Sequence, residues 1–123
     1  MNRKNTEIGE KNICAVDYAF QRIGGKYKGR ILWGFHSYKE VIRYGELRKA
    51  MGDISPKMLT QTLRALEDDG LIHREVYHQV PPKVEYSLTE TGKELIPFIE
   101  YLLEWGKKQL AKNEFSKISK MQD

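Results

Sequence analysis

Residues 55–89 read SPKMLTQTLRALEDDGLIHREVYHQVPPKVEYSLT, and the spacing of apolar residues changes once along this stretch. The first half carries leucines three or four positions apart, at Leu59, Leu63 and Leu66, which predicts a helix with one buried face. Ser55 can accept a free backbone N–H as the N-cap, and Pro56 suits the first helical position, where a missing N–H costs nothing. Gly70 follows where a helix can close, so the pattern predicts a helix over 55–69.

The second half has the pattern of a β-hairpin. Ile72–Tyr77 and Val84–Leu88 are rich in β-branched and aromatic residues, as strands are. Pro81 and Pro82 lie between these two runs and cannot join a strand ladder, so they mark the hairpin tip. Short helices followed by a two-stranded hairpin are the arrangement of a winged helix-turn-helix.

The predicted helix over 55–69 also has a distinctive outer face. At 100° per residue, four polar side chains gather opposite the leucines: Lys57, Thr60, Gln61 and Arg64. Arginine and lysine can pair with guanine, glutamine with adenine, and threonine with a base or a phosphate. An ordinary solvated face has similar residues, and only the hairpin that follows favours nucleic-acid recognition. The acidic residues 67–69 lie at the C-terminal end of this helix. Negative charges there interact unfavourably with the helix dipole, and the sequence shows no structural reason for them.

The remaining helices are predicted from apolar residues at helical spacing, over residues 14–23, 28–38, 44–51 and 90–112. Residues 39–43 form a link or a short extended piece, and Pro97 predicts a bend or a late start in the last helix. The predicted fold class is mainly α with a small β-hairpin wing. The domain boundaries are a flexible arm at 1–12, one winged-helix domain at 13–112 that includes a C-terminal dimerisation helix, and a frayed tail at 113–123.

Composition narrows the class of protein further. The 123 residues match one domain, and the net charge of +4 permits an anionic partner without establishing one. We expect a cytoplasmic protein with no membrane partner, because the sequence lacks an apolar run of membrane length and a signal segment. Phosphate-cradling loops, serine elbows and HExxH motifs are missing, so we expect no enzyme. His36, His73 and His78 lack metal-ligand spacing, so no metal or cofactor is expected.

The order of motifs resembles the HxlR family of bacterial winged-helix regulators, which are related to the MarR group. The matching segments are CAVDYAFQRIGGKYKGRILW from residue 14, RYGELRKAM from 43, ISPKMLTQTLRALEDDGLIHREVY from 54 and VPPKVEYSLTETG from 80. The resemblance spans residues 14–105 and implies a dimeric transcription factor that binds double-stranded DNA. Family members usually have tryptophan where this chain has Tyr27, and often arginine where it has Lys83.

The resemblance implies that the helix Ser55–Asp69 enters the major groove and that the wing Tyr77–Lys83 lies along the flanking backbone or minor groove. The expected wing and backbone contacts are Arg43, His78 and Lys83, whereas the expected contacts of the recognition helix are Ser55, Lys57, Thr60, Gln61 and Arg64. A solvated lysine is the alternative for Lys83. Phosphate contacts supply affinity and salt dependence, and base contacts supply specificity.

The terminal helices are the predicted dimer interface, because one recognition helix per chain reads only half of a palindrome. The last helix has apolar residues around more than half of its circumference, more than packing on its own domain needs. The expected interface residues are Val16, Phe20, Phe98, Leu102 and Trp105. The alternative is that these residues fill the core of one monomer.

Cys14 is the single cysteine and lies near a helix N-terminus, where a thiol ionises more readily. Some HxlR-type regulators sense oxidants or electrophiles through a cysteine at this position. A disulfide here would have to join two chains or one chain and a small thiol, and the alternative is a buried packing residue. The main hypothesis is a homodimeric winged-helix repressor of a palindromic operator. The second hypothesis is a regulator of the same fold that a redox or small-molecule effector switches, with Cys14 as the sensor of oxidants or electrophiles. A winged helix that binds proteins rather than DNA is the rival from another class.

Overall fold

The computed structural model describes the chain from residue 14 to residue 122, with side chains to residue 114. Residues 14–23 are helical and are called the N-terminal helix below. The elements that follow are α2 (Lys28–Ser37), β1 (Val41–Arg43), α3 (Tyr44–Met51), α4 (Pro56–Asp68), β2 (Ile72–Tyr77), β3 (Lys83–Leu88), α5 (Glu90–Glu94) and α6 (Ile96–Gln122). The expected arm at 1–12 lies outside the described residues.

Helix α4 begins and ends as its sequence predicts. The Ser55 hydroxyl accepts the backbone N–H of Met58 at 3.1 Å, which satisfies one of the free donors of the first turn. At the other end Gly70 adopts φ = 72°, a left-handed conformation that suits glycine. The backbone N–H of Leu71 donates to Leu66 and that of Gly70 to Glu67, at 3.0 and 2.9 Å, which is the Schellman pattern.

The sheet has three strands rather than the two of the predicted hairpin. β3 lies in the middle, with β2 on one side and β1 on the other, and both pairs are antiparallel. Ile42 of β1 pairs with Tyr86 of β3 and is 1% exposed. Residues 39–43 therefore include an extended segment, one of the two alternatives, because pairing with β3 buries Ile42 in the core.

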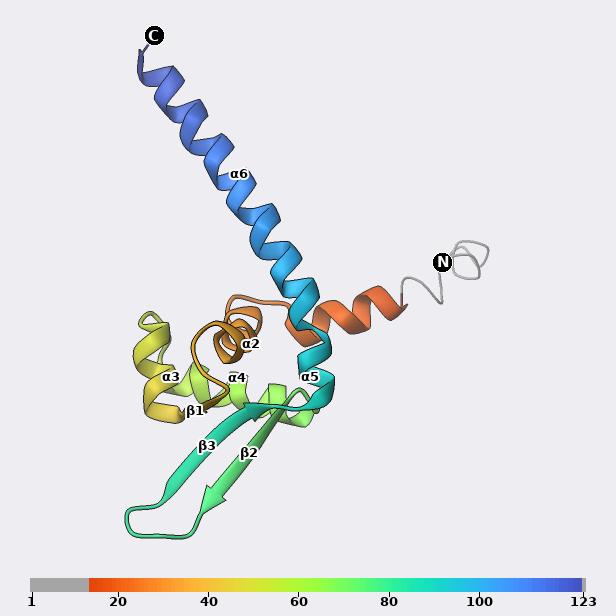
Figure 1. Cartoon of the computed structure of the whole chain (residues 1–123), viewed down its shortest axis with the longest axis vertical. Coiled ribbons are helices and arrows are strands. Elements are labelled where there is room, and N and C mark those ends of the chain that lie inside the picture. Colours follow the sequence, from red (N-terminus) through yellow and green to blue (C-terminus); the bar gives the residue numbers. More distant parts are fainter. Residues whose placement is uncertain (1–13, 123) are drawn as a thin grey trace.

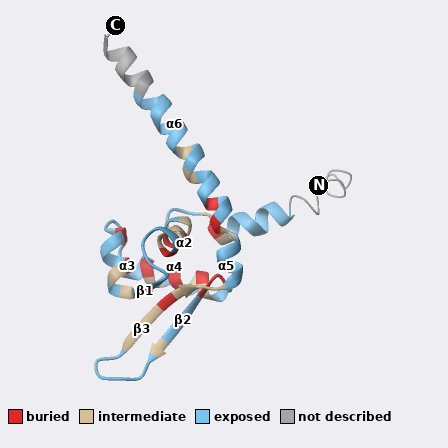
Figure 2. Cartoon of the chain, in the orientation of Figure 1, coloured by how far each residue is buried: buried red, intermediate tan, exposed pale blue. Residues whose placement is uncertain are grey.

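The core lies between α2, α3, α4 and the root of the sheet (Figure 2). Ile31, Leu32 and Leu59 are fully buried, and the leucine stripe of α4 faces inward as predicted. The start of α5 approaches the turn after α4 so closely that a Cβ at Gly92 would collide with the Leu71 carbonyl. The wing tip and the far part of α6 extend beyond this core (Figure 1).

The last helical region is divided in two, as Pro97 predicted. α5 ends at Glu94, and α6 starts at Ile96, directly before the proline. Ile96 and Ile99 are buried, whereas most of the later side chains of α6 are exposed. The backbone stays helical to Gln122, so the predicted end near residue 112 was too early. Helix-favouring lysine, glutamate and glutamine there outweigh the weaker apolar pattern. None of the described helices is long and apolar enough to span a membrane.

Candidate nucleic-acid interface

The outer face of α4 carries the predicted basic and amide side chains in the open. Lys57, Gln61 and Arg64 are exposed, whereas Leu59 and Leu63 on the opposite face are buried. Neither cation forms an ion pair with any side chain between residues 14 and 114. Met58 is 41% exposed beside them, an apolar contribution that sequence reasoning missed. This face combines unpaired charge, an amide and an apolar group, which suits contact with DNA bases and phosphates.

The other two predicted residues of this helix are already engaged within the domain. Ser55 uses its hydroxyl for the N-cap bond described above. Thr60 is half-buried, and its hydroxyl lies 3.4 Å from that of Tyr44 on α3, which is in turn 3.2 Å from the Pro56 carbonyl. These contacts fix the start of α4 relative to α3, so Ser55 and Thr60 have a structural role independent of any DNA contact.

The two predicted DNA contacts of the wing, His78 and Lys83, differ in how far they are exposed. His78 is exposed in the turn that joins β2 to β3. Lys83 lies at the root of the turn, half-buried, with its ammonium 4.6 Å from the centre of the Tyr77 ring and 3.8 Å from the Glu85 carboxylate. Glu85 in turn raises the pKa of the Tyr77 hydroxyl. The solvated alternative for Lys83 does not hold, because the side chain is anchored at the base of the wing.

Arg43 and Lys83 lie together although 40 positions separate them in the sequence. Both line a cleft of about 300 Å³ between the wing and the start of α3, with Gly45 and Gln79. The Arg43 backbone N–H donates to the Glu46 carboxylate at 3.1 Å, which caps α3 and holds the strand end in place. Two cations from different elements thus lie on one side of the wing.

A further cation, Arg74, joins the recognition helix from β2. Arg74 and Arg64 line one cleft of about 230 Å³ with Glu67 and Tyr86. Sequence reasoning missed Arg74, although a signal existed. Alternate residues of a strand share a face, so the buried Ile72 directs Arg74 toward α4 as well.

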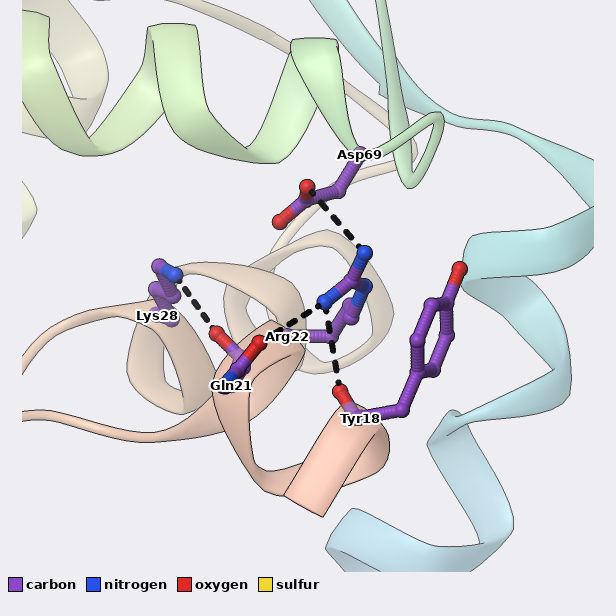
Figure 3. Close-up of polar contacts among 5 residues, drawn as sticks. All are labelled: Tyr18, Gln21, Arg22, Lys28 and Asp69. Carbon is purple, nitrogen blue, oxygen red and sulfur yellow. Dashed lines mark hydrogen bonds and ion pairs between the residues drawn. The ribbon is translucent and has the colours of Figure 1, made fainter. Parts of the chain in front are cut away.

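Arg22 connects the N-terminal helix to the C-terminal end of α4 (Figure 3). Its guanidinium lies over the Tyr18 ring, 3.5 Å from the centroid, donates to the Gln21 side chain at 3.4 Å, and reaches Asp69 at 3.9 Å. The Arg22 Nε is buried without a partner among the described residues. The sequence alone offers no structural reason for an acidic residue at position 69. In the structure, Asp69 links the end of α4 to the N-terminal helix.

A second ion-paired group holds α2 against α3. Arg30 donates to Asp53 at 3.3 Å and to the Met51 carbonyl at 3.3 Å, while Lys26 is 3.7 Å from the same carboxylate. The Arg30 hydrogen bond holds the pKa of Asp53 below its ordinary value. Lys28 donates to the Gln21 carbonyl at 2.7 Å. Lys26, Lys28 and Arg30 thus each form a contact within the domain.

The predicted interface residues of the terminal helices are all exposed. Val16 and Phe20 on the N-terminal helix and Phe98, Leu102 and Trp105 on α6 are each 40–56% exposed. They do not fill the core of the monomer, which rules out that alternative. Tyr101 and Leu110 add to the apolar surface of α6, at 68% and 63% exposed. An apolar surface of this kind is typical of a protein interface.

Cys14 is exposed at the first described turn of the N-terminal helix. Within a single chain Cys14 is therefore not a buried packing residue. Among the residues that the structure describes, no three histidine, cysteine, aspartate or glutamate side chains are grouped to hold a metal ion.

Comparison with known proteins identifies a consistent set of relatives. Residues 22–114 match the sequence profile of the family described as HxlR-like helix-turn-helix. The HTH-type transcriptional regulator YybR of Bacillus subtilis is 46% identical over 106 residues, which are 86% of this chain and 83% of YybR. YdeP, another HTH-type regulator of Bacillus subtilis, is 52% identical over 95 residues, 77% of this chain and 73% of YdeP.

Solved structures agree with this fold. The redox regulator HypR in its reduced form superposes with a TM-score of 0.74 and 46% identity, covering 81% of this chain and 97% of HypR. Its oxidised form gives a TM-score of 0.70 and 48% identity, covering 77% of this chain and 96% of that chain. Each of these structures thus matches more than three quarters of this chain.

Proposed function

The chain belongs to the HxlR-like helix-turn-helix family of transcriptional regulators, and from this premise we propose that it is a homodimeric repressor that occupies a palindromic operator. The observation that carries the proposal is the outer face of α4, where Lys57, Gln61 and Arg64 are exposed and the two cations are without ion pairs among the described residues. Such a face can enter a major groove while the leucines on the opposite side hold the helix on the core.

The wing and the strand end supply the backbone contacts in this proposal. Arg43 and Lys83 share one cleft beside the wing, and His78 is exposed in the turn. The positively charged side chains of Arg43 and Lys83 would bind phosphates that flank the major groove occupied by α4. These contacts would set the register on the duplex and the salt dependence of binding, with little sequence preference.

Two copies would meet through the N-terminal helix and α6. The exposed apolar surface of Val16, Phe20, Phe98, Leu102 and Trp105 supports this arrangement, since large aromatic side chains anchor protein interfaces. A dimer with twofold symmetry would place its two α4 helices about 34–36 Å apart, one turn of DNA. Each half-site of the palindrome would then meet the same residues.

A gel-shift titration with DNA from upstream of the protein's own gene tests the proposal. The variants Lys57→Ala, Gln61→Ala and Arg64→Ala are each expected to weaken binding. Lys108→Ala is a matched control, because Lys108 is an exposed cation on α6 rather than on α4. If all three α4 variants bind a true operator as tightly as the control does, the assignment of this face is wrong.

We propose in addition that Cys14 makes the repressor responsive to oxidants. The specific observation is an exposed thiol in a chain that resembles the redox regulator HypR. Two thiols, from two copies or from one copy and a small thiol, would form a disulfide and give two protons and two electrons to a peroxide. The O–O bond of the peroxide breaks, and the products are two waters from hydrogen peroxide, or an alcohol and one water from an organic hydroperoxide. A Cys14→Ser protein should then keep its DNA affinity and lose its response to peroxide. A normal response from that variant would eliminate the idea.

A further inference from the structure

A cleft of about 670 Å³ lies where α2, the sheet and the α5–α6 junction meet. Its walls come from the last turn of α2, the start of β1, the end of β3, and the first turns of α6. Ligand pockets in proteins commonly have volumes of about 300–1,000 Å³, so this cleft is large enough for a small organic molecule. None of the lining residues belongs to α4 or to the wing turn.

Part of the cleft wall is apolar. Phe35 and Ile96 line it and are 2% and 7% exposed, and the lining residue Leu88 is half-buried. Val41 on β1 is 44% exposed at the rim. A ligand with a hydrocarbon or aromatic body would remove this apolar surface from water.

Two glutamates and one lysine line the cleft, and His36 lines it as well. Glu40, directly before β1, and Glu100, on α6, both line it, and neither has an ion-pair partner among side chains 14–114. The one lysine in the lining, Lys93, is bound to Glu90 at 3.1 Å. The end of α2 and the start of α6 carry partial charges of opposite sign, so they do not decide the preference. The two carboxylates of Glu40 and Glu100 decide the preferred charge of the ligand, and they favour a cation.

The cleft lies on the side of α6 that faces away from the proposed dimer surface. At about 100° per residue, the cleft-lining positions Ile96 and Glu100 lie roughly opposite the exposed Phe98, Leu102 and Trp105 on the α6 surface. A partner that covers the aromatic side of α6 therefore leaves the cleft side free.

We propose that this cleft binds an organic cation with an apolar body and that binding alters affinity for DNA. The regulatory part rests on the proposed function, since the cleft joins α6, the proposed dimer helix, to β1 and β3, which carry Arg43 and the wing. An occupant between them favours one angle between the dimer helix and the wing sheet. A ligand shifts such an equilibrium by as much as it prefers one angle over the other.

Two ions of the same shape and opposite charge provide the test. Tetraphenylphosphonium and tetraphenylborate are titrated separately into the full chain, without DNA, by isothermal calorimetry in sodium buffer. We expect saturable binding of one phosphonium per chain and at least about tenfold weaker binding of the borate. The double variant Glu40→Gln/Glu100→Gln should weaken phosphonium binding about fivefold, the scale of exposed charge pairs. Val41→Trp, at an exposed position, should block it.

Glu104→Gln is the matched control, because Glu104 is an exposed carboxylate on α6 outside the cleft, and it should bind as the parent does. Absent binding, equal binding of both ions, or an unchanged double variant would overturn the site. Tighter binding by a chain that lacks residues 1–12 would identify that segment as the occupant and overturn the proposal as well. Calorimetry needs no DNA, so it reports on the cleft even if the operator assignment fails. Phosphonium that binds without changing operator affinity in the parent chain would overturn the regulatory part.

Discussion

Two sets of basic residues in this chain, each containing both arginine and lysine, have opposite surroundings. Arg22, Lys26 and Arg30 are paired with acidic side chains and hold the N-terminal helix, α2 and the loop after α3 together. Lys57 and Arg64 on α4 face outward with no acidic partner among the described side chains. Net charge treats the two sets alike, but only an unpaired cation has its full charge available for a phosphate or a base. Pairing, rather than the number of cations, thus separates these two sets.

The largest effect that tests this comparison should come from Arg64. Arg64→Ala should lower specific DNA affinity by about 1–3 kcal/mol and relax the preference at one base position, because the guanidinium can bind guanine with two hydrogen bonds. Stability should change by less than about 0.5 kcal/mol, since the side chain is exposed. Binding curves on an operator and on single-base variants measure the first effect, and urea unfolding measures the second. A large loss of stability would place Arg64 with the structural set.

Lys57 should have a smaller and less specific effect. Lys57→Ala should weaken binding to all sequences by similar factors, because a phosphate is present at every position of the duplex. The slope of log affinity against log salt should fall by about 1 if the lysine binds one phosphate. Titrations between 50 and 200 mM salt on operator and random DNA provide the measurement. An unchanged slope would show that Lys57 does not bind a phosphate.

Arg22 should show the opposite pattern. Arg22→Met retains an apolar stem but can no longer bind the Tyr18 ring or Asp69 through a guanidinium, so it should destabilise the domain by about 0.5–1 kcal/mol. Lys112→Met, on the exposed part of α6, is a control for removing one positive charge. Urea unfolding of both variants is the measurement. Equal stability of Arg22→Met and its control would show that this anchor contributes nothing.

The smallest expected effect is the contribution of Asp53 to the pH dependence of folding stability. Because Arg30 lowers the folded pKa of this carboxyl below its ordinary 3.8, ionised Asp53 stabilises the fold above that value. The contribution is lost as the pH falls from about 3.8 through the lower folded pKa. Asp53→Asn should therefore lower stability at neutral pH and flatten its decline in acid. Thermal unfolding between pH 2 and pH 7 checks this, and identical profiles would contradict the pairing.

Much of the fold was predictable because its signals are local. Three residues mark the ends of α4: Ser55 accepts a free backbone N–H, Pro56 lacks the N–H that would be unpaired, and Gly70 can adopt a positive φ. The structure confirms all three. The break before Pro97 and the prolines in the wing turn were predictable for the same reason. The outward position of Lys57, Gln61 and Arg64 followed from helical period and the leucines alone.

The remaining features depend on residues that are distant in sequence. No local pattern reveals that Ile42 pairs beside Tyr86, that Tyr44 meets Thr60, or that Arg74 comes to lie beside Arg64. Nor does it distinguish Arg30, bound to Asp53, from Arg64, which has no acidic partner in the described part of the chain. The amino-acid order alone determined which segments are helix or strand and which face of each is apolar, because those preferences act over a few residues. Only the tertiary structure decided which charges neutralise one another, because that requires packing of the helices and strands to bring distant side chains within contact distance.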